Sequence, residues 1–329
     1  MPHSRRHFVA NQLYTVTFRV RRGLPLVATN YIKLLLGGIM ARALRDDKIT
    51  LCHHLWMANH PHFLAICHDA QMLVDFYAEV QKKVTDAVKS LLGVSHLALW
   101  QGRPIVARVT DLDAAINQVV YLYANPTRAN LVDTIEQYPG LNSFLSFKNC
   151  ALHSEVSTPV VSSEYWVSHV QIPCLPEHSM RLHKDLDFTE ELKKKGIKCE
   201  LKTFPNAWMK CFGIESKAEV AETNQRILGR LKEREQMHRE TRILEKKTVI
   251  GERELRVQSI LKDHIPPQCQ RRAFVISSNK KERIAYIEEF KAICKKCVQC
   301  FKDALMGLCC EWPPGVFRPS LRHVASALA

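Results

Sequence analysis

The sequence predicts an α+β fold for residues 1–150. Short runs rich in β-branched and aromatic residues alternate with longer segments whose apolar residues recur every three or four positions. That order is typical of helices packed on a sheet. The chain has 329 residues and 46% of them are hydrophobic, so it can bury a sizeable core and still carry additional segments.

Four segments are expected to form the strands. Residues 13–20 are rich in threonine, valine and aromatic side chains, which favour extended backbone. Residues 49–56 and 63–66 are apolar runs joined by a short link, and this spacing predicts a hairpin. A brief apolar run at residues 105–107 predicts the fourth strand.

Three helices are expected between these strands. An apolar stripe at helical spacing runs through residues 31–44, and another runs through residues 73–92, where a glycine follows. Asp111 or Asp113 could cap a third helix that extends to Tyr123. A proline three positions beyond that tyrosine marks the end of this helix or a bend in it.

The remainder of the chain is expected to be a linker followed by a mostly helical, basic region. The composition shifts to serine, threonine, valine and proline at residues 154–164, so we assign residues 151–185 to the linker and residues 186–329 to the C-terminal region. Residues 217–247 are dense in glutamate, arginine and lysine with a thin apolar stripe. They predict a solvated helix, and contact with nucleic acid is the alternative.

The charge balance points to a polyanionic partner. The net charge is +14 and the isoelectric point is near 9.3, a composition typical of nucleic-acid-binding proteins, although a merely basic protein is the alternative. No apolar run approaches the roughly 18 residues of a membrane span. The N-terminus lacks the apolar stretch of a signal peptide. We therefore expect a cytoplasmic, nucleoid-associated protein with no membrane partner.

Twelve cysteines are present, and three of them form a regular cluster. Cys294, Cys297 and Cys300 are spaced three apart, which is compatible with a zinc site or with a buried stripe on one helix. The helical interpretation is favoured because apolar residues of helical spacing lie on both sides and no turn separates the cysteines. Disulfides are not expected in a cytoplasmic protein.

Four residues form the candidate site. His60 and His62 begin an apolar strand and, two positions apart, present both imidazoles on one face, as a divalent metal requires. Tyr121 and Asn125 share one face of the third helix. Tyr123 is the rival nucleophile and lies about 200° further round that helix. A metal, a hydroxyl and an amide oxygen together predict phosphodiester chemistry, whereas satisfied histidines in a strand are the structural alternative.

Two segments carry a family resemblance. Residues 57–63 resemble the Met-Pro-Asn-His-hydrophobic-His-hydrophobic signature of single-tyrosine HUH transposases. Residues 121–132 resemble the Tyr-x-x-x-Asn-Pro-x-Arg-Ala-Gly-Leu-Val signature of the same proteins, which are insertion-sequence-200-like. Within the group the chain is most similar to the REP-associated tyrosine transposases, over residues 8–147.

The resemblance implies a ferredoxin-like or RRM-like antiparallel sheet with packed helices and with the histidines on a central strand. It implies that Tyr121 attacks single-stranded DNA near a hairpin, with Mg²⁺ or Mn²⁺ held by His60, His62 and Asn125. The product would be a 5′-phosphotyrosine that is later rejoined, and a homodimer is one compatible assembly. Basic residues that could steer the strand are Arg19, Arg21, Arg22, Lys82, Lys83 and Arg128.

Two residues depart from the signatures. Asn130 replaces a glycine, a mild change because asparagine also tolerates a left-handed helix cap. Pro61 replaces an aliphatic or aromatic residue; without an N–H it should remove a ladder hydrogen bond and could shift the histidines. A catalytically impaired DNA- or RNA-binding protein is therefore the alternative function. A third alternative is another metal hydrolase, which would need acidic ligands. His53 and His54 are expected to be structural.

Overall fold

The computed structural model describes residues 7–46, 49–153, 158–175, 188–265 and 274–317. A five-stranded sheet lies at its centre, in the order β2-β3-β1-β4-β7. The strands are β1 (Gln12–Thr17), β2 (Ile49–Met57), β3 (His60–Cys67), β4 (Ile105–Val109) and β7 (Val275–Ile276). The four predicted strands pair antiparallel. The sheet as a whole is mixed, because β7 adds in parallel to the edge of β4.

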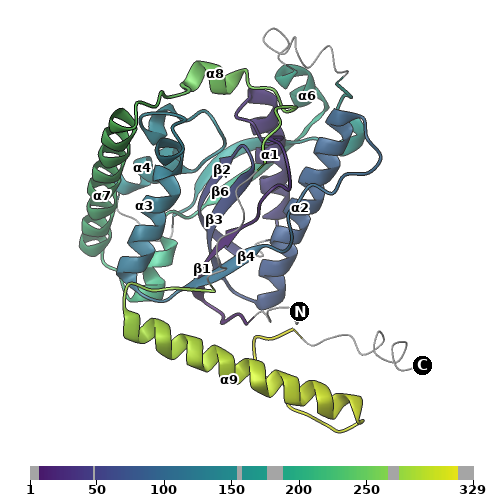
Figure 1. The fold of residues 1–329 in the computed structure, drawn as a ribbon, viewed down its shortest axis with the longest axis vertical. Coiled ribbons are helices and arrows are strands. Elements are labelled where there is room, and N and C mark those ends of the chain that lie inside the picture. The colour runs from purple at the N-terminus through teal and green to yellow at the C-terminus, as the bar shows by residue number, and fades with distance from the viewer. Residues whose placement is uncertain (1–6, 47–48, 154–157, 176–187, 266–273, 318–329) are drawn as a thin grey trace.

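Helices cover both faces of the sheet (Figure 1). The helices that cover the sheet or pack on that cover are α1 (Asn30–Ala43), α2 (Ala70–Leu92), α3 (Leu112–Arg128), α4 (Phe144–His153) and α7 (Lys217–Leu244). Phe63 and Ala65 of β3 belong to the core shared with α1 and α2, whereas Leu64 and Ile66 belong to the core shared with α3, α4 and α7. Alternate residues of the central strand therefore face opposite layers, as the pleat requires.

Local signals explain where the predicted helices begin and end. The Asp69 carboxylate accepts hydrogen bonds from the first turn of α2, which stops at Gly93 in the left-handed region with φ of 65°. Asp111 caps α3 by accepting from the Ala114 amide at 2.7 Å. Pro126 lies inside the last turn of α3, so the helix runs past it to residue 128 instead of ending there.

The predicted linker is wrong over residues 160–166. This segment forms β5 (Val160–Trp166), which pairs antiparallel with β6 (Ile197–Thr203), because its β-branched and aromatic residues favour a strand. The hairpin packs on α1, where Gly38 permits the approach: a Cβ on that residue would collide with the Tyr165 carbonyl. The smaller elements are η1 (Ile135–Gln137), η2 (His169–Gln171), α6 (Thr189–Lys195), η3 (Ala207–Phe212) and α8 (Glu252–Arg256).

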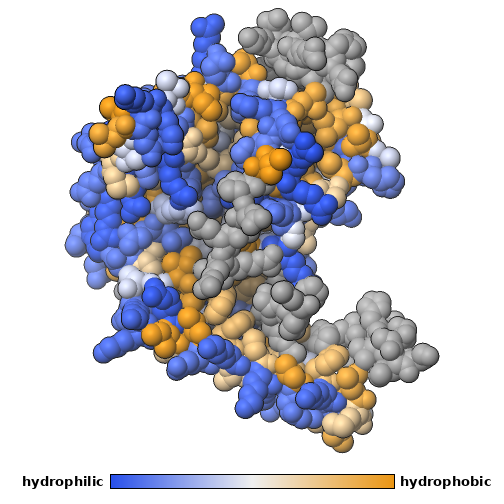
Figure 2. All heavy atoms as spheres, viewed as in Figure 1, coloured by the Kyte–Doolittle hydropathy of each residue, from blue (hydrophilic) through white to orange (hydrophobic). Residues whose placement is uncertain are grey.

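The C-terminal region packs directly on the first 150 residues and adds a strand to their sheet. The apolar stripe of α7 is buried, with Val220, Ile227 and Leu231 in the core beside α3, while most of its remaining surface is hydrophilic (Figure 2). β7 extends the sheet, and Ser277 donates to the Asp111 carboxylate at 2.8 Å. The long helix α9 (Lys280–Leu305) follows and runs along the bottom of the view in Figure 1.

The cysteine cluster lies on α9 without a turn, as the helical interpretation predicts. Cys297 and Cys300 are buried and Cys294 is partly buried. Within the described residues, no three or more histidine, cysteine, aspartate and glutamate side chains are grouped so as to hold a metal ion. In the same part of the chain, no helix combines the length and apolar character needed to cross a membrane.

Candidate metal and nucleic-acid site

The histidine pair lies at the start of β3, between β2 and β1. His60 and His62 are partly buried, and their ring centroids are 4.7 Å apart with the planes at 74°. Since Leu64 and Ile66 of the same strand face α3, the two imidazoles face the α3 layer as well. The period-two spacing thus places both rings over one face of the sheet.

Tyr121 of α3 meets this pair within the same chain. Its ring centroid lies 5.8 Å from that of His62, and the planes are nearly perpendicular at 89°. The guanidinium carbon of Arg128, two turns along the helix, lies 5.4 Å from the centre of the tyrosine ring. One side of α3 therefore brings a tyrosine ring to His62 and a cation to that ring.

Tyr123 occupies a different environment. It is fully buried, and its hydroxyl lies 2.8 Å from Nδ1 of His53 and 3.0 Å from the hydroxyl of Ser143. Burial raises the pKa of Tyr123 far above its ordinary value. His53 and His54 are also buried, and desolvation lowers the pKa of each to about 3. These groups form a polar network inside the core.

The ring nitrogens of the pair are in a form that can bind a metal. Nδ1 of His60 lies 2.6 Å from the Asn59 side-chain oxygen, which only accepts, so Nδ1 carries the proton and Nε2 keeps its lone pair. Nε2 of His62 is buried without a hydrogen-bond partner among the described residues. Sequence reasoning missed the part played by Asn59, although this residue directly precedes the first histidine.

Burial and nearby cations keep both imidazoles neutral at pH 7. Desolvation lowers the pKa of His60, with further contributions from His62, Arg19 and Arg128. Desolvation, Arg19 and Arg128 lower the pKa of His62 to about 4. Neutral imidazole is the metal-binding form. The two charged residues that act on the pair are both positive, so the surroundings favour an anionic ligand.

Asn125 is the remaining predicted ligand. Its side chain is buried one turn beyond Tyr121, and its amide nitrogen donates to the Leu122 carbonyl at 3.4 Å. The side-chain oxygen is the atom that a metal ligand requires. Two neutral imidazoles and one amide oxygen suit Mg²⁺ or Mn²⁺, with the remaining positions left to water or phosphate oxygens.

Pro61 ends one ladder without displacing the histidines from their common face. The β1–β3 register stops at Thr17 opposite His62, immediately before the proline, while β2 still pairs Trp56 with Pro61. The Thr17 hydroxyl donates to the Pro61 carbonyl at 2.7 Å. This side-chain bond supports β3 at the point where the strand lacks a backbone donor.

The structure gathers only part of the predicted basic set at the site. Arg19 and Arg128 lie close enough to the histidines to shift their pKa values. The backbone amide of Arg21 donates to the Leu99 carbonyl, and the Arg19 carbonyl accepts from the Gln101 amide. Arg22 instead forms a two-bond ion pair with Asp263, with both distances at 2.8 Å.

The two predicted lysines lie elsewhere. Lys82 and Lys83 belong to α2, which covers the face of the sheet opposite α3. The ammonium of Lys83 lies 5.4 Å from the ring centre of Trp166. Neither lysine is brought together with the histidine pair.

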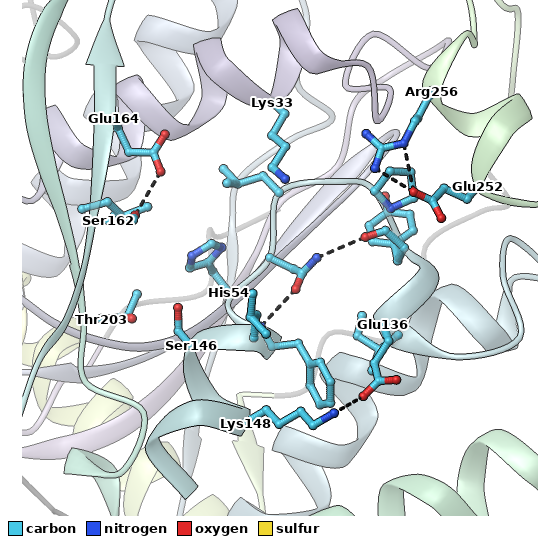
Figure 3. A pocket seen from close by; sticks show the side chains of 18 residues that line it. Lys33, His54, Glu136, Ser146, Lys148, Ser162, Glu164, Thr203, Glu252 and Arg256 are labelled. Carbon is cyan, nitrogen blue, oxygen red and sulfur yellow. Dashed lines mark hydrogen bonds and ion pairs between the residues drawn. The ribbon is translucent and has the colours of Figure 1, made fainter. Parts of the chain in front are cut away.

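A separate pocket of about 490 Å³ lies beside the β2 edge, between α1, the β5–β6 hairpin and residues 135–148 (Figure 3). Its charges are largely matched: Lys148 pairs with Glu136, and Arg256 pairs with Glu252 at 2.7 Å. Balanced charge does not favour a polyanion, in contrast to the surroundings of the histidine pair.

Comparison with solved structures finds a similarity to a REP-associated tyrosine transposase that was solved bound to a REP hairpin. The two chains share 19% identity, the match covers 45% of this chain and 86% of that chain, and the TM-score is 0.39. No family model and no curated protein matches this chain. A functional assignment therefore depends on the geometry of the site.

Proposed function

We propose that this protein nicks and rejoins single-stranded DNA through Tyr121, with Mg²⁺ or Mn²⁺ as cofactor. The observation that carries the proposal is the 5.8 Å approach of the Tyr121 and His62 rings on the face that also holds His60. Because the tyrosine and the histidines belong to one chain, the site does not need a tyrosine from a second copy.

The proposed reaction is a transesterification. The hydroxyl oxygen of Tyr121 attacks a DNA phosphorus, the bond from phosphorus to the 3′-oxygen breaks, and the tyrosine proton passes to solvent while the leaving oxygen becomes a 3′-hydroxyl. The 5′-phosphotyrosine retains the ester bond energy, so attack by a 3′-hydroxyl reverses the step without ATP. DNA containing hairpins of the REP type is the substrate that we propose.

The metal ligands proposed are Nε2 of His60, Nε2 of His62 and the side-chain oxygen of Asn125. A bound divalent cation would supply Lewis-acid polarisation of the phosphate. Asn59 fixes the tautomer of His60 by accepting its Nδ1 proton. Neutral rings at pH 7 avoid competition between protons and metal.

Arg19 and Arg128 are proposed to hold the phosphate and to compensate its charge. Arg128 lies over the tyrosine ring, where a guanidinium stabilises negative charge that develops on the phenolic oxygen. The charged groups that shift the pKa values of the two histidines are Arg19 and Arg128, and their positive charge favours an anionic substrate.

A binding protein that has lost cleavage is the second candidate function. The observation that favours it is the end of the β1–β3 ladder at Thr17 and His62, next to Pro61. A less firmly held strand would orient the imidazoles less well, while the basic surroundings would still attract nucleic acid.

Incubation with single-stranded DNA from the flanks of the gene, in Mn²⁺, separates these candidates. We expect a covalent protein–DNA adduct that Tyr121→Phe abolishes while leaving DNA binding intact. Binding without an adduct would favour the second candidate. Cleavage without an adduct would instead indicate the metal-hydrolase alternative, with water as the nucleophile.

A further inference from the structure

Two groups of basic residues on α7 differ in their partners. The first group attaches the helix to α3 and the segment after it. Arg230 pairs with Asp113 at 2.8 Å, and Arg242 pairs with Asp133. Each of these arginines is neutralised by a carboxylate and serves the packing of the helix.

Arg234 and His238 form the second group. They are four residues apart and share one face of the helix. Arg234 is exposed and His238 is partly buried. Over the described residues, no acidic side chain forms an ion pair with Arg234. The sequence alone does not single out these two residues, because charges of both signs are mixed along this helix.

Hydrogen bonds place this part of α7 beside the end of α3. The Glu235 carboxylate accepts from the Ile135 amide at 2.7 Å, and Arg239 donates to the Asp133 carbonyl at 3.2 Å. Both partners belong to the segment that directly follows α3. One turn before Arg234, Arg230 donates to Asn117 of α3 at 3.0 Å. The turn of α7 that carries Arg234 and His238 therefore lies beside α3, between these two sets of contacts.

Arg128 belongs to the last turn of α3. Desolvation, Arg234 and Arg128 together lower the pKa of His238, so both guanidiniums act on this imidazole. No carboxylate contributes to that shift. Two carboxylates of the same part of α7 have other partners: Glu235 accepts a backbone amide, and Glu240 accepts from Gln236 at 2.7 Å.

We propose that Arg234 and His238, together with Arg128, form a phosphate-binding surface that holds the substrate strand beside the nucleotide attacked by Tyr121. The identity of the strand rests on the proposed function. Both guanidiniums act on His238, so this part of the surface carries positive charge that favours an anionic strand. Because Arg128 also lies over the Tyr121 ring, the surface is continuous with the candidate site.

Salt dependence of binding tests this surface. The full chain and its variants are titrated with a fluorescent single-stranded oligonucleotide from about 50 to 200 mM salt. For each phosphate of a single strand that a variant no longer neutralises, the slope of log K against log salt should decrease in magnitude by about 0.7. We expect that decrease for Arg234→Gln, whereas Arg234→Lys, which retains the charge, should keep the wild-type slope.

Lys232→Gln is the matched control. It removes the same charge from an exposed position of the same helix, about 200° away from Arg234. Its slope should equal that of wild type. Equal slopes for Arg234→Gln and Lys232→Gln would overturn the inference.

The adduct assay on the same proteins separates this inference from the proposed function. If wild type forms the Tyr121 adduct and the slopes are all equal, the surface is refuted and the function stands. If wild type forms no adduct but Arg234→Gln alone shows the smaller slope, the surface stands as a binding site and the proposed chemistry is refuted.

Discussion

Replacing Tyr123 and Tyr121 separately by phenylalanine makes the same chemical change at two positions of one helix, with opposite expected results. Tyr123→Phe should destabilise the fold and leave the covalent adduct intact. Tyr121→Phe should abolish the adduct and leave stability nearly unchanged. The contrast follows from burial, because Tyr123 is fully buried and Tyr121 is partly exposed beside the histidines.

The magnitude follows from the hydrogen bonds. The Tyr123 hydroxyl bonds to His53 at 2.8 Å and to Ser143 at 3.0 Å. Ser143 keeps its bonds to the His54 backbone in the variant, so the cost falls on the buried Nδ1 of His53. One buried polar group left without its partner costs about 1–3 kcal/mol. For Tyr121→Phe we expect a change within about 0.5 kcal/mol, as for a surface substitution.

Urea unfolding gives the stability of each variant, and gel mobility after denaturation gives the adduct. The reasoning requires that loss of stability and loss of adduct occur in different variants. Loss of the adduct in Tyr123→Phe, at wild-type stability, would reverse the assignment of the nucleophile. A stability change below about 0.5 kcal/mol in Tyr123→Phe would show that the buried network contributes little.

Three further predictions concern the metal site and the core. Pro61→Val restores an N–H at a strand position and should raise Mn²⁺ affinity and adduct yield; an unchanged yield would show that the Thr17 bond already suffices. Asn59→Ala should weaken Mn²⁺ binding about 10–100-fold by releasing the His60 tautomer, as calorimetry can measure. His53 and His54 have pKa values of about 3 in the fold against about 6.5 unfolded, so the unfolded chain binds more protons between these values. Unfolding free energy should therefore fall as pH drops below 6.5, by roughly 1.4 kcal/mol per unit for each buried histidine, and a flat profile between pH 6.5 and 5 would contradict it.

Periodicity predicted the elements that form the candidate site. The two-residue spacing of the histidines placed both rings on one face of β3, and the four-residue spacing of Tyr121 and Asn125 matched one side of α3. These are local properties, because side-chain direction follows directly from strand and helix geometry. Tyr123 is fully buried, whereas Tyr121 is partly exposed beside the histidines. This difference agrees with the angle of about 200° between the two residues on the helix.

Long-range packing could not be predicted from the same patterns. The segment expected to be a linker contains β5. Its composition favours extended backbone, but its pairing with β6, more than 30 positions away in the chain, cannot be read from local composition. Arg22 was a candidate for nucleic-acid contact, yet it pairs with Asp263, which is 241 positions away in the chain. Lys82 and Lys83 were grouped with the site by charge alone, whereas the fold places their helix on the other face of the sheet.

The most direct test of the central claim is to identify the residue that becomes linked to DNA. The protein is incubated with single-stranded DNA and Mn²⁺, digested with protease and nuclease, and examined by mass spectrometry for a peptide that carries a nucleotide through a phosphate. We expect the 5′-phosphate on Tyr121, in wild type and in Tyr123→Phe alike. A nucleotide on any other residue, or cleaved DNA with no linked peptide, would contradict the account.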